Sequence, residues 1–372
     1  MRLLADLRPR RESQDFRRLW SGSTLSACGS ALTQFAVPLQ IYDLTHSPLA
    51  VGGVGVAEMI PTLTIGLAGG SLADATDRRK VVLIASTCSA AVSAALTAQA
   101  YARLDLLFLL YGLVALQSAA GAVGAPARRA FIPNLLTDQL LMAGLALNRL
   151  SFQIMLVAGP VVAGLITSAP GLGLPVCYLL DTVSFAAAIY SVGRLRPMPP
   201  HDGLSRPSAR AVAEGLDLIR RSQRLAGAFL ADLDATVFAL PVALFPAINA
   251  ERFDGNPATL GLLTAAIGVG GLLSAALSGP LNVVSRPGRA MLWTVALWGA
   301  AFAGFALVQK LWPTLVLLAV AGAADTLTVV LRGAIVQTNT PDHLRGRVTA
   351  AEYVVGAGGS QLGNLGSGHL GP

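Results

Sequence analysis

A dense cluster of charged residues occupies positions 70–80, between two long apolar stretches. Gly70 allows two helices to approach closely, and the carboxylate of Asp74 can accept the positive end of a neighbouring helix. Arg78 and Arg79 can anchor the turn at the cytoplasmic surface of a membrane. These features predict a turn that joins neighbouring helices at the membrane surface. An ordinary solvated turn is the alternative.

Three carboxylates inside apolar stretches are candidates for carrying a proton. An ionisable group within a membrane is costly unless it faces a cavity or a partner, and such groups exchange protons in many transport cycles. Glu58 and Asp325 come from opposite halves of the chain and could face one cavity near the middle of the membrane. Asp181 ranks third, because it neighbours Ser184 and a structural hydrogen bond that fixes helix packing explains it as well. A packing role stays open for the other two.

These residues lie in a chain that is far too apolar for a soluble protein. Of its 372 residues, 53% are hydrophobic and 13% charged, and its mean hydropathy is +0.61. A soluble domain of this size needs many more polar residues to cover its surface. The composition therefore predicts an all-α integral membrane protein, whose surface faces lipid.

Stretches of about 20 apolar residues are long enough to cross a bilayer as helices. The predicted spans are 19–42, 48–73, 81–101, 104–127, 140–168, 174–193, 225–249, 258–284, 290–308, 312–335 and 348–370. These eleven spans suggest a twelfth that is missing, since the last stretch reaches Pro372 with no basic residue after it. The charged N-terminus and the length of the first span argue against a cleavable signal peptide.

The net charge of +7 reflects the placement of basic residues and not a nucleic-acid partner. Lysines and arginines gather before residue 19, in the even-numbered loops and in the central loop, whereas Arg103, Arg252 and Lys310 are the ones found in the odd-numbered loops. By the positive-inside rule, the N-terminus and the central loop are expected in the cytoplasm. The chain is thus expected to be a multi-pass membrane protein.

The cysteines and histidines indicate neither a metal site nor a cofactor. Cys28, Cys88 and Cys177 lie inside apolar spans without ligand spacing, so small packing residues are the simpler interpretation. The chain has no phosphate-binding loop of the Gly-x-x-x-x-Gly-Lys-Ser/Thr kind, which argues against direct ATP coupling. No activated serine or cysteine suggests an enzyme.

The sequence divides around a segment rich in proline, serine and arginine. Residues 1–195 would form an N-terminal six-helix half, 196–224 a cytoplasmic linker, and 225–372 a C-terminal half that lacks its last helix. Within the linker, Leu216 and Ile219 share an apolar face, which favours an interfacial helix as much as a solvated one. Residues 279–289 repeat the 70–80 cluster loosely, as expected of parallel repeats.

Several of these motifs resemble the major facilitator superfamily. The spacing from Gly70 to Arg79 is similar to that of its loop between helices 2 and 3. The resemblance implies a conformational latch that holds helices together in one state of the protein and releases them in another, with Arg128 and Arg129 as partners of Asp74. Gly159, Pro160 and Gly164 resemble the export-associated motif of helix 5, although a proline kink without directional meaning is the alternative. The motifs that point to one branch are Ala125–Asn134, Asp181–Phe185, Val37–Gln40, Thr45–Ser47, Ser285–Gly288, Gln337–Pro341 and Leu344–Val348.

Together these motifs resemble the branch that contains the bacterial enterobactin exporters and the macrolide-type efflux pumps. The resemblance implies two six-helix halves and a proton-coupled secondary transporter with no cofactor, which would be a monomer in the bacterial inner membrane. Its partners would be protons, membrane lipid and a small-molecule substrate, such as the catecholate siderophore enterobactin, exported across the inner membrane. Two alternatives remain: a broad-specificity drug or macrolide efflux pump, and a non-transporting membrane receptor or scaffold.

Overall fold

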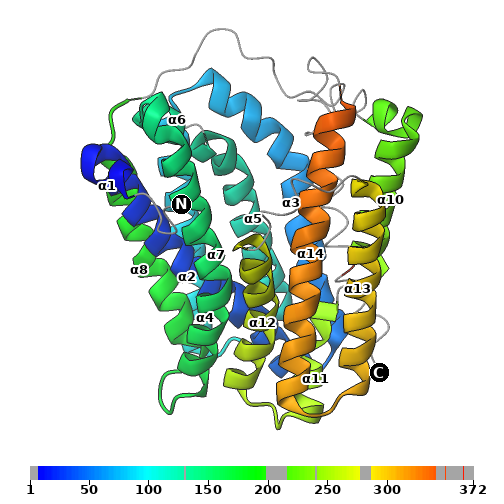
Figure 1. Cartoon of the computed structure of the whole chain (residues 1–372). Helices are drawn as coiled ribbons and strands as arrows, with labels where there is room; N and C mark the ends of the chain where they lie inside the picture. The colour runs from blue at the N-terminus through cyan, green and yellow to red at the C-terminus, as the bar shows by residue number, and fades with distance from the viewer. Residues whose placement is uncertain are drawn as a thin grey trace. The chain divides into compact units, whose positions relative to one another are not determined.

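The computed structural model describes residues 7–129, 131–197, 216–238, 241–276, 286–340, 348 and 363. Every regular element of these residues is a helix (Figure 1). The chain divides into two compact units, one of Met1–Leu44 with Ala57–Arg206 and one of Thr45–Val56 with Pro207–Pro372. The first part of the third helix thus belongs to the second unit.

The helices from the N-terminus to the end of the predicted sixth span belong to the first unit, apart from the first part of the third helix. They are α1 (Arg8–Glu12), α2 (Gln14–Thr45), α3 (Pro48–Ala75), α4 (Arg78–Ala102), α5 (Leu107–Arg129), α6 (Phe131–Leu135), α7 (Asp138–Ser168) and α8 (Leu174–Gly193). α4 packs against α5 and α8, and α7 packs against α1, α6 and α8. At one end of the unit, Leu19, Val82 and Phe131 are buried in a common apolar cluster, which removes their side chains from solvent and lipid alike.

The second unit contains the helices of the predicted C-terminal half. They are α10 (Gln223–Phe238), the 3-10 turn η1 (Pro241–Leu244), α11 (Phe245–Arg252), α12 (Pro257–Ala276), α13 (Pro287–Leu307) and α14 (Leu311–Asn339). α14 is the central element, because it packs against α12, α13 and α10. A side chain on Gly270 or Gly322 would overlap the backbone of the facing helix, so α12 and α14 touch through their backbones, as small residues allow in membranes.

Eight helices in the described part of the chain are long and apolar enough to cross a membrane. They correspond to predicted spans two to six and eight to ten. α2 is long enough as well, but its serine, threonine and glutamine residues make it more polar than the other eight. The prediction of an all-helical membrane protein is confirmed, whereas the count of eleven spans stays a prediction. The eleventh, 348–370, lies outside the described residues except for Val348 and Gly363.

The predicted span at 225–249 is not one continuous helix. α10 ends at Phe238, a 3-10 turn begins at Pro241, and α11 begins at Phe245. Pro241 and Pro246 lack the N–H group that an uninterrupted helix would use, and their rings clash with the preceding turn. The short helix at 216–221, within the predicted linker, buries Ile219 against Leu225 and Phe229, so this part of the linker packs on protein.

Candidate functional site

The carboxylate of Asp181 lies at the centre of a buried polar cluster in the first unit. Asp181 is fully buried and accepts hydrogen bonds from Thr33 at 2.8 Å, Ser93 at 2.7 Å and Ser30 at 3.3 Å. The donors belong to α2 and α4, and the acceptor belongs to α8. Because a buried charge is tolerated when hydrogen bonds surround it, these hydroxyl groups explain how a carboxylate can occupy a membrane helix.

A second buried cluster joins the same three helices. The side-chain amides of Gln40 in α2 and Gln99 in α4 donate to each other, at 3.3 and 3.1 Å, and the hydroxyl of Tyr178 in α8 donates to Gln40 at 2.8 Å. Each amide thereby supplies hydrogen-bond partners to the other, and the three side chains are buried. The hydrogen-bonded side chains of these two clusters lie along the contact of α2, α4 and α8. We call them the polar seam.

Small residues bring α2 and α8 close enough to form the seam. A Cβ atom on Gly29 would overlap Ser184 and the backbone of Asp181, and one on Gly22 would overlap Ser191. Since Gly22 faces Ser191 and Gly29 faces Ser184, the two helices run antiparallel along a contact of small residues. Such contacts allow interhelical hydrogen bonds in membranes, and they set the distance from Thr33 to Asp181.

The predicted latch residues lie at or near the ends of α3, α4 and α5. Gly70 and Asp74 belong to the last turns of α3, and their side chains, with that of Arg129, are outside the described residues. Arg79 donates to the backbone carbonyl of Gly193, the last residue of α8, and Arg128 donates to Ser86 of α4 at 3.0 Å.

The start of α4 is fixed by its own residues. Asp77 caps the helix, because its carboxylate accepts the N–H of Arg79 at 3.0 Å. Arg78 is buried. Arg79 and Arg128 therefore hold α4 against α8 and α5 within the first unit, and the partner of Asp74 stays a prediction.

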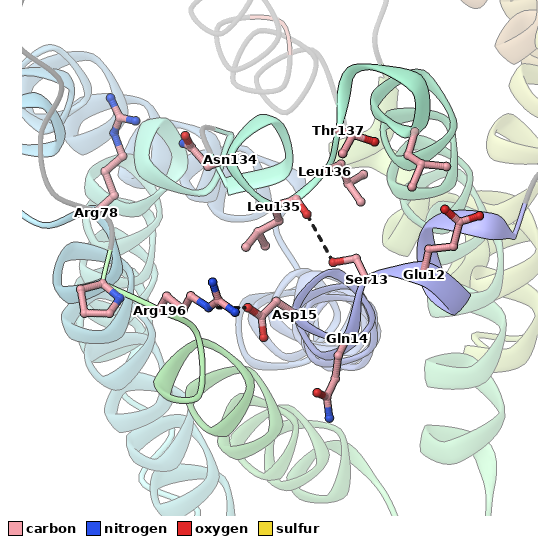
Figure 2. Close-up of a pocket in the computed structure, with 12 residues that line it drawn as sticks. Glu12, Ser13, Gln14, Asp15, Arg78, Asn134, Leu135, Leu136, Thr137 and Arg196 are labelled. Carbon is pink, nitrogen blue, oxygen red and sulfur yellow. Dashed lines mark hydrogen bonds and ion pairs between the residues drawn. The ribbon is translucent and has the colours of Figure 1, made fainter.

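A cavity of about 660 Å³ opens beside Arg78 (Figure 2). It lies between the start of α2, the turn from α6 to α7, the start of α4 and the segment after α8. Asp15 forms ion pairs with Arg196 at 3.9 Å and with Arg18 at 3.7 Å, and Ser13 donates to the carbonyl of Leu135 at 3.3 Å. The lining residues are Glu12, Ser13, Gln14, Asp15, Arg78, Asn134, Leu135, Leu136, Thr137, Leu140, Arg196 and Pro197.

The other predicted carboxylates differ from Asp181 in exposure. Glu58 of α3 is half-buried, and Asp325 of α14 is exposed. The backbone carbonyl of Glu58 accepts a hydrogen bond from Ser118 of α5 at 2.8 Å. The two belong to different units, so a common cavity for them stays a prediction.

The glycines and the proline predicted in helix 5 lie within α7. Pro160 is inside the helix and buried, as are Gly159 and Gly164. A Cβ atom on Gly159 would meet the side chain of Ala31 in α2. The motif therefore brings α7 close to α2, and its predicted directional meaning is untested.

The sequence did not single out the residues that surround Asp181. Ser30, Thr33 and Ser93 are short hydroxyl residues in apolar helices, and such residues commonly bond to their own backbone instead. Gln40 and Gln99 carried a stronger signal, since a glutamine amide needs partners inside a membrane. A search for uncharged polar residues in the predicted spans would have found all five.

The all-helical fold, the eight described helices that can cross a membrane and the comparisons below define a multi-pass membrane transporter of the major facilitator type. The model of the family described as "Transmembrane secretion effector" matches residues 5–372, and the chain belongs to this family. The chain is 28% identical over 364 residues to the "Enterobactin exporter EntS" of Shigella boydii serotype 18, covering 95% of this chain and 85% of that protein. The protein of the same name from Escherichia coli O139:H28 gives the same values.

Solved structures of transporters share the fold. A bacterial homologue of the iron transporter ferroportin in its inward-facing state gives a TM-score of 0.74 at 17% identity, covering 96% of this chain and 92% of that one. The nucleoside transporter NupG gives 0.75 at 16% identity, with 96% and 90% covered. At these identities the structural likeness concerns the fold alone.

Proposed function

We propose that this protein exports a catecholate siderophore such as enterobactin across the inner membrane of a bacterium, driven by the proton gradient. The observation that carries this proposal is the similarity of 95% of the chain to proteins named as enterobactin exporters. The N-terminus would lie in the cytoplasm, as the placement of basic residues predicts. Export by alternating access needs two units that move against each other around a binding site.

Exposure separates the three candidate proton carriers. A group that carries a proton must meet water during the cycle, and Asp325 is exposed while Glu58 is half-buried. Asp181 has no exposed surface, and its carboxylate accepts hydrogen bonds from hydroxyl groups of two other helices. These contacts favour a packing role for Asp181, and Glu58 and Asp325 are the proposed carriers.

Flux of labelled enterobactin into inside-out membrane vesicles tests the proposed function. Vesicles that contain the full chain should accumulate enterobactin when their interior is acidic, and a protonophore should abolish the accumulation. Vesicles without the protein are the control.

Three other outcomes would count against the proposal in different ways. Accumulation that survives the protonophore would refute proton coupling. Strong inhibition by unrelated apolar drugs such as erythromycin would indicate a broad efflux pump. The absence of flux of either enterobactin or erythromycin would indicate a protein that does not transport them, as expected of a receptor or scaffold.

A further inference from the structure

α7 carries an exposed arginine in a segment that crosses the membrane. The apolar span covers Gln139–Ser168, and Arg149 is exposed. A helix of 31 residues is about 46 Å long by the helical rise. When it is centred on a hydrocarbon core of about 30 Å, Arg149 lies about 9 Å below the surface of that core.

The position of Arg149 indicates that its side of α7 does not face lipid. A guanidinium exposed to hydrocarbon is strongly unfavourable, and such residues line water-filled cavities or bind partners instead. Near the end of a helix, an arginine can avoid the hydrocarbon by extending its side chain so that the guanidinium reaches the lipid headgroups. Arg149 instead packs against Phe152, one turn deeper, with its guanidinium carbon 5.8 Å from the centre of the ring.

The residues in line with Arg149 are apolar and exposed. Met142, Leu145, Arg149, Phe152 and Leu156 follow each other at alternating spacings of three and four, so they share one face of the helix. All five are exposed, with 75% for Met142 and 51% for Phe152. This face, which we call the Arg149 stripe, presents one cation and one aromatic ring in an otherwise aliphatic surface.

The chemistry of the Arg149 stripe fits an acidic aromatic compound. A guanidinium binds a carboxylate or another planar oxyanion through two parallel hydrogen bonds. The neighbouring ring can stack against an aromatic group, and methionine adapts to ligands of different shape. A cationic compound would meet the positive charge of Arg149 in a medium that screens it poorly.

We propose that Arg149 and Phe152 bind the acidic and aromatic parts of the transported molecule, so that the transporter selects anionic over cationic compounds. This inference rests on the proposed export function and adds its charge selectivity. It assigns Arg149 the role of a specificity-determining residue on the translocation path. Anionic cargo distinguishes a siderophore exporter from a pump for basic drugs.

Binding of two catechols of opposite charge to the purified full chain tests this inference. Protocatechuate carries a carboxylate and dopamine an ammonium group, while both share the catechol ring. Wild type should bind protocatechuate about tenfold more tightly than dopamine, as expected from about one charge-assisted contact. Isothermal titration calorimetry in detergent measures both affinities without any need for transport.

Variants at the two residues separate charge from shape. Arg149→Gln should lose the preference for protocatechuate, while Arg149→Lys should keep a preference but bind severalfold more weakly, because lysine cannot form the planar double contact. Phe152→Leu should weaken both probes alike. Arg221→Gln is the matched control, since Arg221 is exposed outside the spans and pairs with Asp217 at 2.9 Å.

Three results would overturn the inference: equal binding of the two probes by wild type, binding of neither, or an unchanged preference in a folded Arg149→Gln variant. If that variant does not fold, loss of all preference in Arg149→Lys would overturn it. A separate measurement of vesicle flux distinguishes failure of this inference from failure of the proposed export function. Export without charge preference would refute the inference alone, whereas charge-selective binding without export would refute the proposed function alone.

Discussion

The hydroxyl of Ser93 in α4 donates a hydrogen bond of 2.7 Å to the carboxylate of Asp181 in α8. Both residues are buried, and Thr33 of α2 donates to the same carboxylate. Lipid cannot drive helices together by the hydrophobic effect, so contacts of this kind carry much of their association in a membrane. Asp181 is thus one of two points at which these three helices are joined, the other being the cluster of Gln40, Gln99 and Tyr178.

Replacement of Asp181 by leucine should destabilise the protein strongly. The change leaves the hydroxyls of Ser30, Thr33 and Ser93 without their acceptor, and we expect a loss of about 2–4 kcal/mol in the free energy of unfolding. Asp181→Asn keeps an acceptor oxygen and should lose about 1 kcal/mol. Unfolding in detergent, followed by intrinsic tryptophan fluorescence, measures both. Equal stability of the two variants would refute the joining role of the carboxylate.

An alanine at position 29 should separate α2 from α8. Its Cβ would overlap Ser184 and the backbone of Asp181, and overpacking of this kind costs about 1–3 kcal/mol. Gly112 of α5 is the matched control, because a Cβ there meets no other atom within 4 Å. Gly112→Ala should be neutral or stabilising by up to about 1 kcal/mol. Unfolding midpoints that fall equally for both variants would contradict the close contact.

The paired amides of Gln40 and Gln99 should behave non-additively. Gln40→Leu alone leaves the amide of Gln99 and the hydroxyl of Tyr178 without their observed partner, and we expect a loss of about 2 kcal/mol. The double change to leucine removes both amides and should cost less than the two single changes added together. A double-mutant cycle on unfolding free energies measures this difference, and strict additivity would argue against the pair.

Neutral amides at the proposed proton carriers should uncouple export from the gradient. Glu58→Gln and Asp325→Asn keep the shape of the side chain but cannot release a proton, so substrate exchange should persist while accumulation driven by an acidic interior is lost. Vesicle flux with and without the imposed gradient measures both. Asp181→Asn should retain gradient-driven flux in the molecules that fold. If Glu58→Gln and Asp325→Asn both remain coupled, the proton route lies elsewhere.

The predicted latch is tested by Asp74→Asn. A neutral amide interacts more weakly with a helix N-terminus and with the basic residues Arg128 and Arg129, and the state that the latch stabilises should lose about 1 kcal/mol. We expect slower transport with normal membrane insertion. Flux normalised to the amount of folded protein is the measurement, and a wild-type rate would show that Asp74 has no mechanistic role.

Composition and apolar length were sufficient to predict the helices that position these sites. The span predicted at 174–193 has the bounds of α8, because a bilayer requires a long run of apolar residues whatever their neighbours are. The break between α10 and α11 was missed, although Pro241 and Pro246 indicate it. Average hydropathy conceals a local interruption of the backbone.

From the sequence, Asp181 could be recognised as a candidate residue, but its hydrogen-bond partners could not. Ser93 precedes it by 88 positions, and Ser30 by 151, so no local spacing connects them. Their meeting depends on which helices pack together, and this in turn depends on contacts such as that of Gly29 with Ser184. Arg149 was recognisable from the sequence as a charged residue inside a span, but the exposed face that it shares with its apolar neighbours was not, since exposure of a face can be known only from the packing of the others.

The separation of these donors from Asp181 in the chain bears on the order in which the protein is made. Ribosomes synthesise α2 and α4 before α8, so the hydroxyls of Ser30, Thr33 and Ser93 enter the membrane before their acceptor exists. A chain that stops before Asp181 lacks the acceptor that joins these helices. The carboxylate therefore joins α2 and α4 to α8 only once the last helix of the first unit has been inserted, whereas the amides of Gln40 and Gln99 can connect α2 and α4 before that.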